Sequence, residues 1–184
     1  KDEQWGAANG GDVAFDGNAT GGRAWFQNYP ASISGAYGGV TSFNNNPGWP
    51  DSPKAGASAD NGMNLNFGAT EDFPGGGGHT ELTAKYGMAT AGSGIFVNFG
   101  AQTGYASNAG HTVFTVGAKE TFFPSAENGV YWNHPGKHGG YTEFMSYVTG
   151  ADAKQATAAN GIFHNLGSAS ADEGGGYARI QNRS

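Results

Sequence analysis

The amino-acid sequence predicts an all-β fold of six β-hairpin repeats, each of about 32 residues, in one antiparallel domain with little helix. Glycine accounts for 34 of the 184 residues and aromatic residues for 13%, whereas Leu, Ile and Val are scarce, so aromatic rings must supply the core. Glycine or proline falls every few residues, and only residues 151–159 have a composition that suits a turn or two of helix. The third observation is an internal repeat.

Each repeat opens with a short segment that ends in an amide residue, which we call the anchor. The anchors are Gln4, Asn28, Asn66, Asn98, Asn133 and Asn165. They lie 24, 38, 32, 35 and 32 residues apart, a period typical of repeat architectures. A second segment begins 7 to 12 residues after each anchor with a glycine, which we call the box glycine. The box glycines are Gly11, Gly39, Gly78, Gly110, Gly140 and Gly176.

Both segments of a repeat have strand-like composition, and a connector rich in Gly, Ala, Ser and Asn joins them. We therefore expect a strand to begin at every box glycine and to pair with the anchor strand of its own repeat as a hairpin. Ile95 and Phe99 mark one buried face of an anchor strand, and Phe96 indicates that the other face is at least partly covered. Sandwich, trefoil-like and propeller-like arrangements all suit six hairpins, and a solenoid with stacked Asn ladders is a further alternative.

The five Asn anchors are predicted to be structural. A buried side-chain amide can bond the backbone of the glycine-rich connector, and buried polar groups are nearly always satisfied inside the protein. The first anchor strand, residues 1–5, is too polar to be held by burial. We expect it either to close against the last repeat or to pair with a neighbouring copy of the chain.

Composition excludes several classes of function. The chain has no Cys, and its nine Lys and Arg against fifteen Asp and Glu form no basic cluster, so thiol chemistry and nucleic-acid binding are not expected. No apolar run approaches the length of a membrane-spanning helix. The sequence suggests a single domain over residues 1–184, and its few charged residues are typical of extracellular or cell-surface proteins.

Histidines offer one set of candidate site residues. His79 and His111 follow the box glycines of two repeats, where the next two repeats carry Tyr141 and Tyr177. A position shared by His and Tyr requires a flat amphipathic side chain, which favours packing beside the connector or a ligand-binding surface. A transition-metal site from His134, His138 and His164 is a weaker alternative, because Pro135 and Gly136 rule out a helix between the first two.

Carboxylates offer a second set. The pairs Glu71 with Asp72 and Asp172 with Glu173 lie in glycine-rich connectors, where backbone carbonyls and carboxylates together suit Ca²⁺. Glu81 and Glu143 occupy one repeat position, and a pair of acids about 5–10 Å apart would suit glycoside hydrolysis. Other repeats carry unrelated residues at that position, which favours a solvated strand position instead.

Aromatic residues outside the predicted strands point to sugar recognition. Trp49 lies in a turn-rich insertion with Asn46 and Asp51, and Tyr105 lies in a connector. Flat apolar rings beside amide and carboxylate groups suit carbohydrate. The sequence therefore favours a secreted or surface, non-catalytic, lectin-like protein. A self-assembling subunit of an extracellular filament or surface layer is the alternative, and a polysaccharide-acting enzyme the third.

Overall fold

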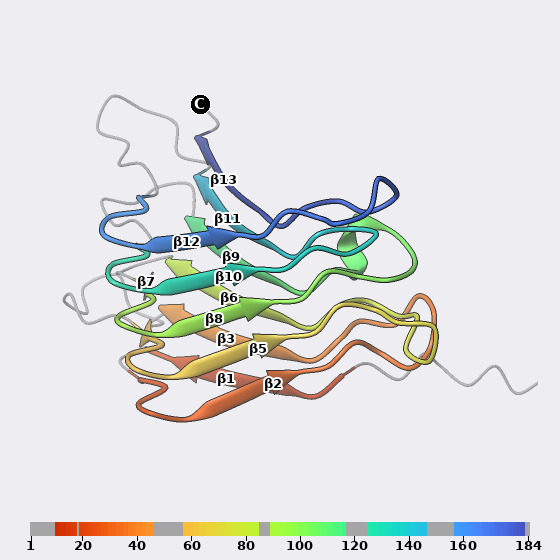
Figure 1. Ribbon diagram of the computed structural model, residues 1–184. Coiled ribbons are helices and arrows are strands. Elements are labelled where there is room, and N and C mark those ends of the chain that lie inside the picture. The colour runs from red at the N-terminus through yellow and green to blue at the C-terminus, as the bar shows by residue number, and fades with distance from the viewer. Residues whose placement is uncertain are drawn as a thin grey trace, which may run out of the picture.

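The protein is a parallel β-solenoid, as a computed structural model shows for residues 10–17, 19–45, 57–84, 89–116, 125–146 and 157–182 (Figure 1). All strand pairs in its sheets are parallel. The predicted antiparallel domain of hairpins, whether sandwich, trefoil-like or propeller-like, is therefore wrong. The all-β repeat architecture is confirmed.

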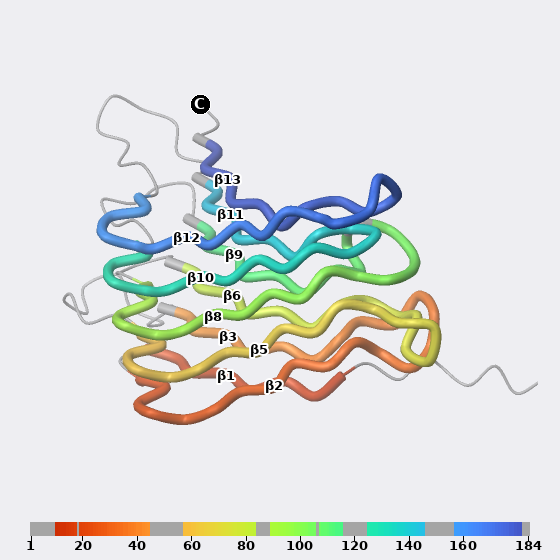
Figure 2. Tube along the Cα trace, viewed as in Figure 1, coloured from red at the N-terminus to blue at the C-terminus, as the bar shows by residue number. Residues whose placement is uncertain are grey.

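Two large sheets face each other along the solenoid. The first sheet, in spatial order, contains β1 (Asp12–Asp16), β3 (Val40–Asn45), β6 (His79–Ala84), β9 (His111–Val116), β11 (Tyr141–Ser146) and β13 (Tyr177–Asn182). The second sheet contains β2 (Trp25–Asn28), β5 (Met63–Asn66), β8 (Ile95–Asn98), β10 (Val130–Asn133) and β12 (Ile162–Asn165). A small third sheet pairs β4 (Ala57–Ser58) with β7 (Ala89–Thr90), and one 3₁₀ helix, η1, spans Ala106–Asn108. Figure 2 shows the chain winding upward from its N-terminal to its C-terminal repeats.

Neighbouring strands of the solenoid pair the residues that the repeat alignment of the sequence places at the same position. Asn98 pairs with Asn66 on one side and Asn133 on the other, and β1, β3, β6, β9, β11 and β13 each begin one residue after a box glycine. The predicted partner of each strand was wrong: the anchor strand leads into the opposite sheet and pairs with anchor strands of neighbouring repeats. A connector of this length turns the chain from one sheet to the other as readily as it closes a hairpin. Gln4 and residues 1–5 lie outside the described residues.

Aromatic stacks fill the interior. Phe114 and Phe144 stack with ring centroids 4.3 Å apart in the first sheet, and Phe96 and Tyr131 stack at 5.0 Å in the second. All four side chains are fully buried. The third side of the core is closed by small residues: Ala57, Ala59, Ala89, Ala91 and Ala126. Identical positions of neighbouring repeats stack about 4.8 Å apart, so flat rings pack well in successive repeats.

The Asn anchors form one continuous hydrogen-bonded ladder. The side-chain Nδ2 of Asn28 donates to Oδ1 of Asn66, and the same bond links Asn66 to Asn98, Asn98 to Asn133 and Asn133 to Asn165, each at 2.8 Å. Buried threonine hydroxyls donate at 3.0–3.1 Å to the Oδ1 atoms of the first four Asn anchors, from Asn28 to Asn133; in the same order they belong to Thr41, Thr80, Thr112 and Thr142. The structural role holds, but the main partners are neighbouring amides and hydroxyls rather than connector backbone. In-register parallel stacking places donor above acceptor at every repeat.

The buried face of the anchor strand is the opposite of the one predicted. Phe96 and Asn98 are fully buried, whereas Ile95 and Val97 lie on the outward side and are partly exposed. The second sheet therefore carries apolar side chains on both of its faces.

Within the described residues, no helix is long and apolar enough to cross a membrane.

Candidate ligand-binding groove

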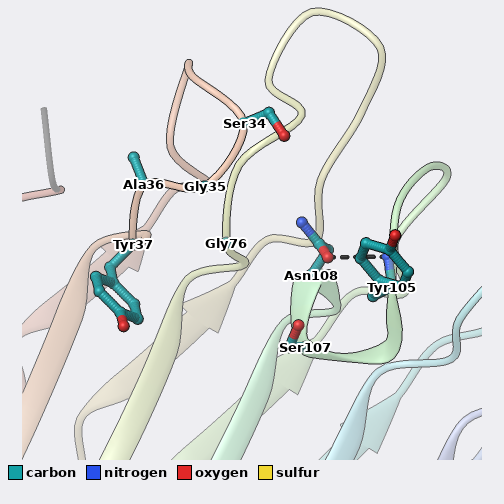
Figure 3. Close-up of a pocket in the computed structure, with 8 residues that line it drawn as sticks. All are labelled: Ser34, Gly35, Ala36, Tyr37, Gly76, Tyr105, Ser107 and Asn108. Atoms are coloured by element: carbon teal, nitrogen blue, oxygen red, sulfur yellow. Dashed lines mark hydrogen bonds between the residues drawn. The ribbon is translucent and has the colours of Figure 1, made fainter. Parts of the chain in front are cut away.

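A groove runs across three successive connectors on the side of the solenoid where the second sheet leads into the first (Figure 3). Its upper part has a volume of about 290 Å³ and lies between Ser34–Tyr37 on one side and Tyr105–Asn108 on the other, with Gly76 between them. A lower part of about 250 Å³ adjoins the upper part, since Tyr37, Gly76 and Ser107 line both. The lower part ends at His79, His111 and Tyr141.

Asn108 holds the connectors in place. Its Oδ1 accepts a bond from the backbone N–H of Tyr105 at 2.9 Å, and its Nδ2 donates to the carbonyl of Gly75 at 2.6 Å. One side chain therefore fixes the turn that carries Tyr105 and ties that turn to the neighbouring connector. Gly104 has a φ of +83°, in the left-handed region that favours glycine, which allows the sharp bend before Tyr105.

Two tyrosines stand at the upper part of the groove. Tyr37 is 73% exposed and Tyr105 is 80% exposed, and they come from connectors on opposite sides of Gly76. Figure 3 shows the two rings projecting from their separate loops. Large aromatic side chains this exposed beside a groove are candidates for contact with a ligand.

The lower part of the groove is lined by a stack of flat polar rings. His79 stacks on His111 at 4.8 Å, and His111 stacks on Tyr141 at 4.7 Å. Burial lowers the pKa of His111 to about 4 and also lowers the pKa of His79, so both rings are neutral near pH 7. Nδ1 of His111 lies 2.9 Å from the carbonyl oxygen of Ala109 and must donate to it, which leaves Nε2 as a hydrogen-bond acceptor.

None of the described residues that line the groove carries a charged side chain. Its polar groups are serine and tyrosine hydroxyls, the side-chain amide of Asn108, two imidazoles, and the backbone of a glycine-rich floor. Such a lining suits a neutral ligand that both donates and accepts hydrogen bonds and that offers apolar patches to aromatic rings.

The structure brings together three of the residues that the sequence suggested for ligand binding. Tyr105, His79 and His111 all line the groove. The other three, Trp49, Asn46 and Asp51, lie outside the described residues. Sequence reasoning counts Tyr37 among the aromatic rings suited to sugar recognition but does not include it in the predicted site. Aligning the connectors backward from their box glycines places Tyr37 and Gly76 at the same repeat position. Tyr37 lies two residues before Gly39, and Gly76 lies two residues before Gly78.

The acidic pairs proposed for calcium lie apart. Glu71 and Asp72 belong to a connector three repeats before that of Asp172 and Glu173. Glu173 accepts a bond from the hydroxyl of Ser168 at 3.0 Å. The described part of the chain has no group of three or more His, Asp or Glu side chains placed to hold one metal ion. Calcium binding by either pair alone stays a prediction.

The histidines of the metal alternative make separate contacts. His134 stacks on Phe99 at 4.9 Å, His164 stacks on Trp132 at 3.9 Å, and Nε2 of His138 lies 2.8 Å from the carbonyl oxygen of Gly104. Each ring thus contacts a different residue of the preceding repeat, and the geometry gives no support to a shared metal ion.

The two glutamates considered for hydrolysis lie outside the groove. Val113 separates Glu81 from Glu143 in the first sheet, so their backbones are two strands, or roughly 10 Å, apart. Glu143 forms an ion pair with Arg179, and Glu81 accepts a bond from Thr83 at 2.7 Å.

No protein-family model, curated protein or solved structure matches this chain. Its function is therefore inferred from the geometry and chemistry of the groove.

Proposed function

We propose that this is a non-catalytic binding protein whose groove takes a neutral carbohydrate, at the cell surface or outside the cell. The observation that carries the proposal is the pair of highly exposed tyrosines, Tyr37 and Tyr105, beside an uncharged groove. The apolar C–H face of a sugar ring packs well on an aromatic ring, and two such rings suit a short oligosaccharide.

The polar lining supports the same ligand class. Sugar hydroxyls both donate and accept hydrogen bonds, and the groove offers serine hydroxyls together with the acceptor nitrogen of His111. A charged ligand would have no oppositely charged side chain in this lining. The low content of charged residues, 13% of the chain, supports an extracellular location. We do not propose hydrolysis, because Glu81 and Glu143 do not line the groove.

Binding to a panel of neutral oligosaccharides of glucose, galactose, mannose and N-acetylglucosamine tests the proposal. The strongest binder is then titrated calorimetrically against Tyr37→Ala and Tyr105→Ala. Each variant should weaken binding by roughly 10-fold, the effect of losing one aromatic stacking contact. Tyr29→Ala is the matched control, since Tyr29 is an exposed tyrosine in the same connector as Tyr37 but does not line the groove. Absence of saturable binding to every glycan, or an equal loss in the control, would contradict the proposal.

A further inference from the structure

The outward side of the second sheet, which we call the apolar face, presents three columns of side chains. The first column is Trp25, Met63, Ile95, Val130 and Ile162; the second is Gln27, Leu65, Val97, Trp132 and His164. The third, one residue beyond each strand, is Tyr29, Phe67, Phe99, His134 and Leu166. None of the fifteen residues is Asp, Glu, Lys or Arg, although the chain carries a net charge of −6.

All side chains of the apolar face are exposed or partly exposed, most of all at its two end strands. Trp25 is 69% exposed, Tyr29 55% and Ile162 52%, whereas the inward residues between these columns build the core. The hydroxyl of Tyr29 donates to the side chain of Gln27 at 2.8 Å, which places the second and third columns on one side of the sheet. In Figure 1 the strands of this sheet lie in front, and no other described strand or helix crosses them.

The face is large for a single chain. Five strands at about 4.8 Å and three columns at about 7 Å span roughly 24 by 20 Å, or on the order of 500 Å². The largest apolar patch of a typical monomer covers roughly 300–600 Å² and commonly serves an interaction. Aromatic stacking within the third column, with Tyr29, Phe67 and Phe99 at 4.8 and 5.0 Å, makes the surface regular and preorganised.

We propose that the apolar face binds the same face of a second copy of this chain. Two copies have the same spacing between strands, so ridges of one face meet grooves of the other over the whole patch, as in sheets packed about 10 Å apart. No Asp, Glu, Lys or Arg side chain of the face has to leave water. Two such faces together cover on the order of 1,000 Å², the lower limit for a specific interface, so the dimer is reversible.

When the same face of two chains meets, the two chains are related by a two-fold axis. Both faces are then occupied, so no further chain can be added through them. The expected assembly is therefore a dimer rather than a filament. The apolar face and the groove share no residue, so dimerisation and ligand binding fail independently.

Sedimentation of the full chain over a range of concentrations tests the dimer. The wild type should shift reversibly from monomer to dimer, and Val97→Lys should weaken association by roughly 100-fold, because a charge at the centre of an apolar contact must be desolvated. Val113→Lys is the matched control: Val113 lies on the outward side of the first sheet in the same repeat, flanked by Glu81 and Glu143. A wild type that stays monomeric, or equal effects of the two variants, overturns the proposal.

A second measurement avoids placing a charge in the sheet. The chain has no Cys, so Val97→Cys and Val113→Cys each introduce a unique thiol. A short bismaleimide should cross-link Val97→Cys into a covalent dimer and leave Val113→Cys monomeric. Equal cross-linking of both variants, or cross-linking of Val97→Cys only after a glycan or lipid vesicles are added, overturns pairing with a second copy.

Discussion

His111 makes folding stability depend on pH. Burial and the neighbouring His79 lower its pKa from 6.5 to about 4, so between these values the unfolded chain binds a proton that the folded chain does not. Stability contributed by the neutral ring is fully present above pH 6.5 and falls by up to about 3 kcal/mol as the pH drops to 4.

Urea unfolding at pH 7 and pH 4.5 measures this loss. His111→Tyr is the control, because tyrosine occupies the same column at Tyr141 and Tyr177 and does not titrate in this range. The variant should lose less stability than the wild type on acidification. An identical loss would show that His111 is not responsible.

Asn98 lies at the middle of the amide ladder. Its side chain bonds Asn66, Asn133, Thr112 and Thr142, so Asn98→Ala removes four hydrogen bonds from the buried network at once. We expect the free energy of unfolding to fall by about 3 kcal/mol, the upper end of the usual cost. Glycan binding per folded molecule should not change.

Asn165→Ala provides the comparison for the ladder. Asn165 is exposed and receives its ladder bond from Asn133 only, so its loss should cost less than about 1 kcal/mol. Chemical unfolding followed by circular dichroism measures both variants. Equal costs would mean that the ladder does not stabilise the interior of the solenoid.

At the scale of the structural element, the box glycine and the anchor are linked across repeats. A Cβ atom at Gly110 would lie 1.9 Å from the carbonyl oxygen of Asn66, and one at Gly78 would lie 1.8 Å from that of Asn28. The box glycines of the last four repeats therefore let their strands begin directly against the anchor of the preceding repeat. This contact explains why glycine and asparagine recur together in the sequence.

Gly110→Ala should destabilise the protein by more than about 3 kcal/mol, since backbone on both sides must move. Gly11→Ala is a matched control, because Gly11 occupies the same position of the first repeat and a Cβ there would meet no atom within 4 Å. Thermal unfolding of the two variants measures the difference. Similar melting temperatures would contradict the close approach.

At the scale of the whole molecule, each repeat contacts only its neighbours, so stability is a sum of local and nearest-neighbour contributions. Ile180 in β13 is 50% exposed, whereas Phe114 and Phe144 at the same position of β9 and β11 are fully buried. Backbone amides of β13 should therefore exchange with solvent faster than those of β9. Hydrogen exchange measured by mass spectrometry checks this, and uniform protection would indicate one cooperative unit instead.

Sequence reasoning predicted some residues of the candidate groove but not their arrangement. Tyr105, His79 and His111 were predicted because exposed rings on connectors and a shared His and Tyr position indicate binding surfaces. Tyr37 was grouped with the rings suited to sugar recognition but not placed in the site, because only the folded paths of the connectors bring it across Gly76 from Tyr105. A binding site made by three connectors depends on contacts between repeats, which no single repeat encodes.

The sequence by itself determined the all-β class, the register of the repeats and the structural role of the anchors, because these follow from local composition and from the spacing of Asn and Gly. Only the tertiary structure decided the direction of strand pairing and the buried face of the second sheet. Two short strands joined by a glycine-rich connector suit a hairpin and a solenoid equally well. The solenoid aligns identical residues in neighbouring repeats, and the amide ladder and aromatic stacks that stabilise it exist only after that alignment.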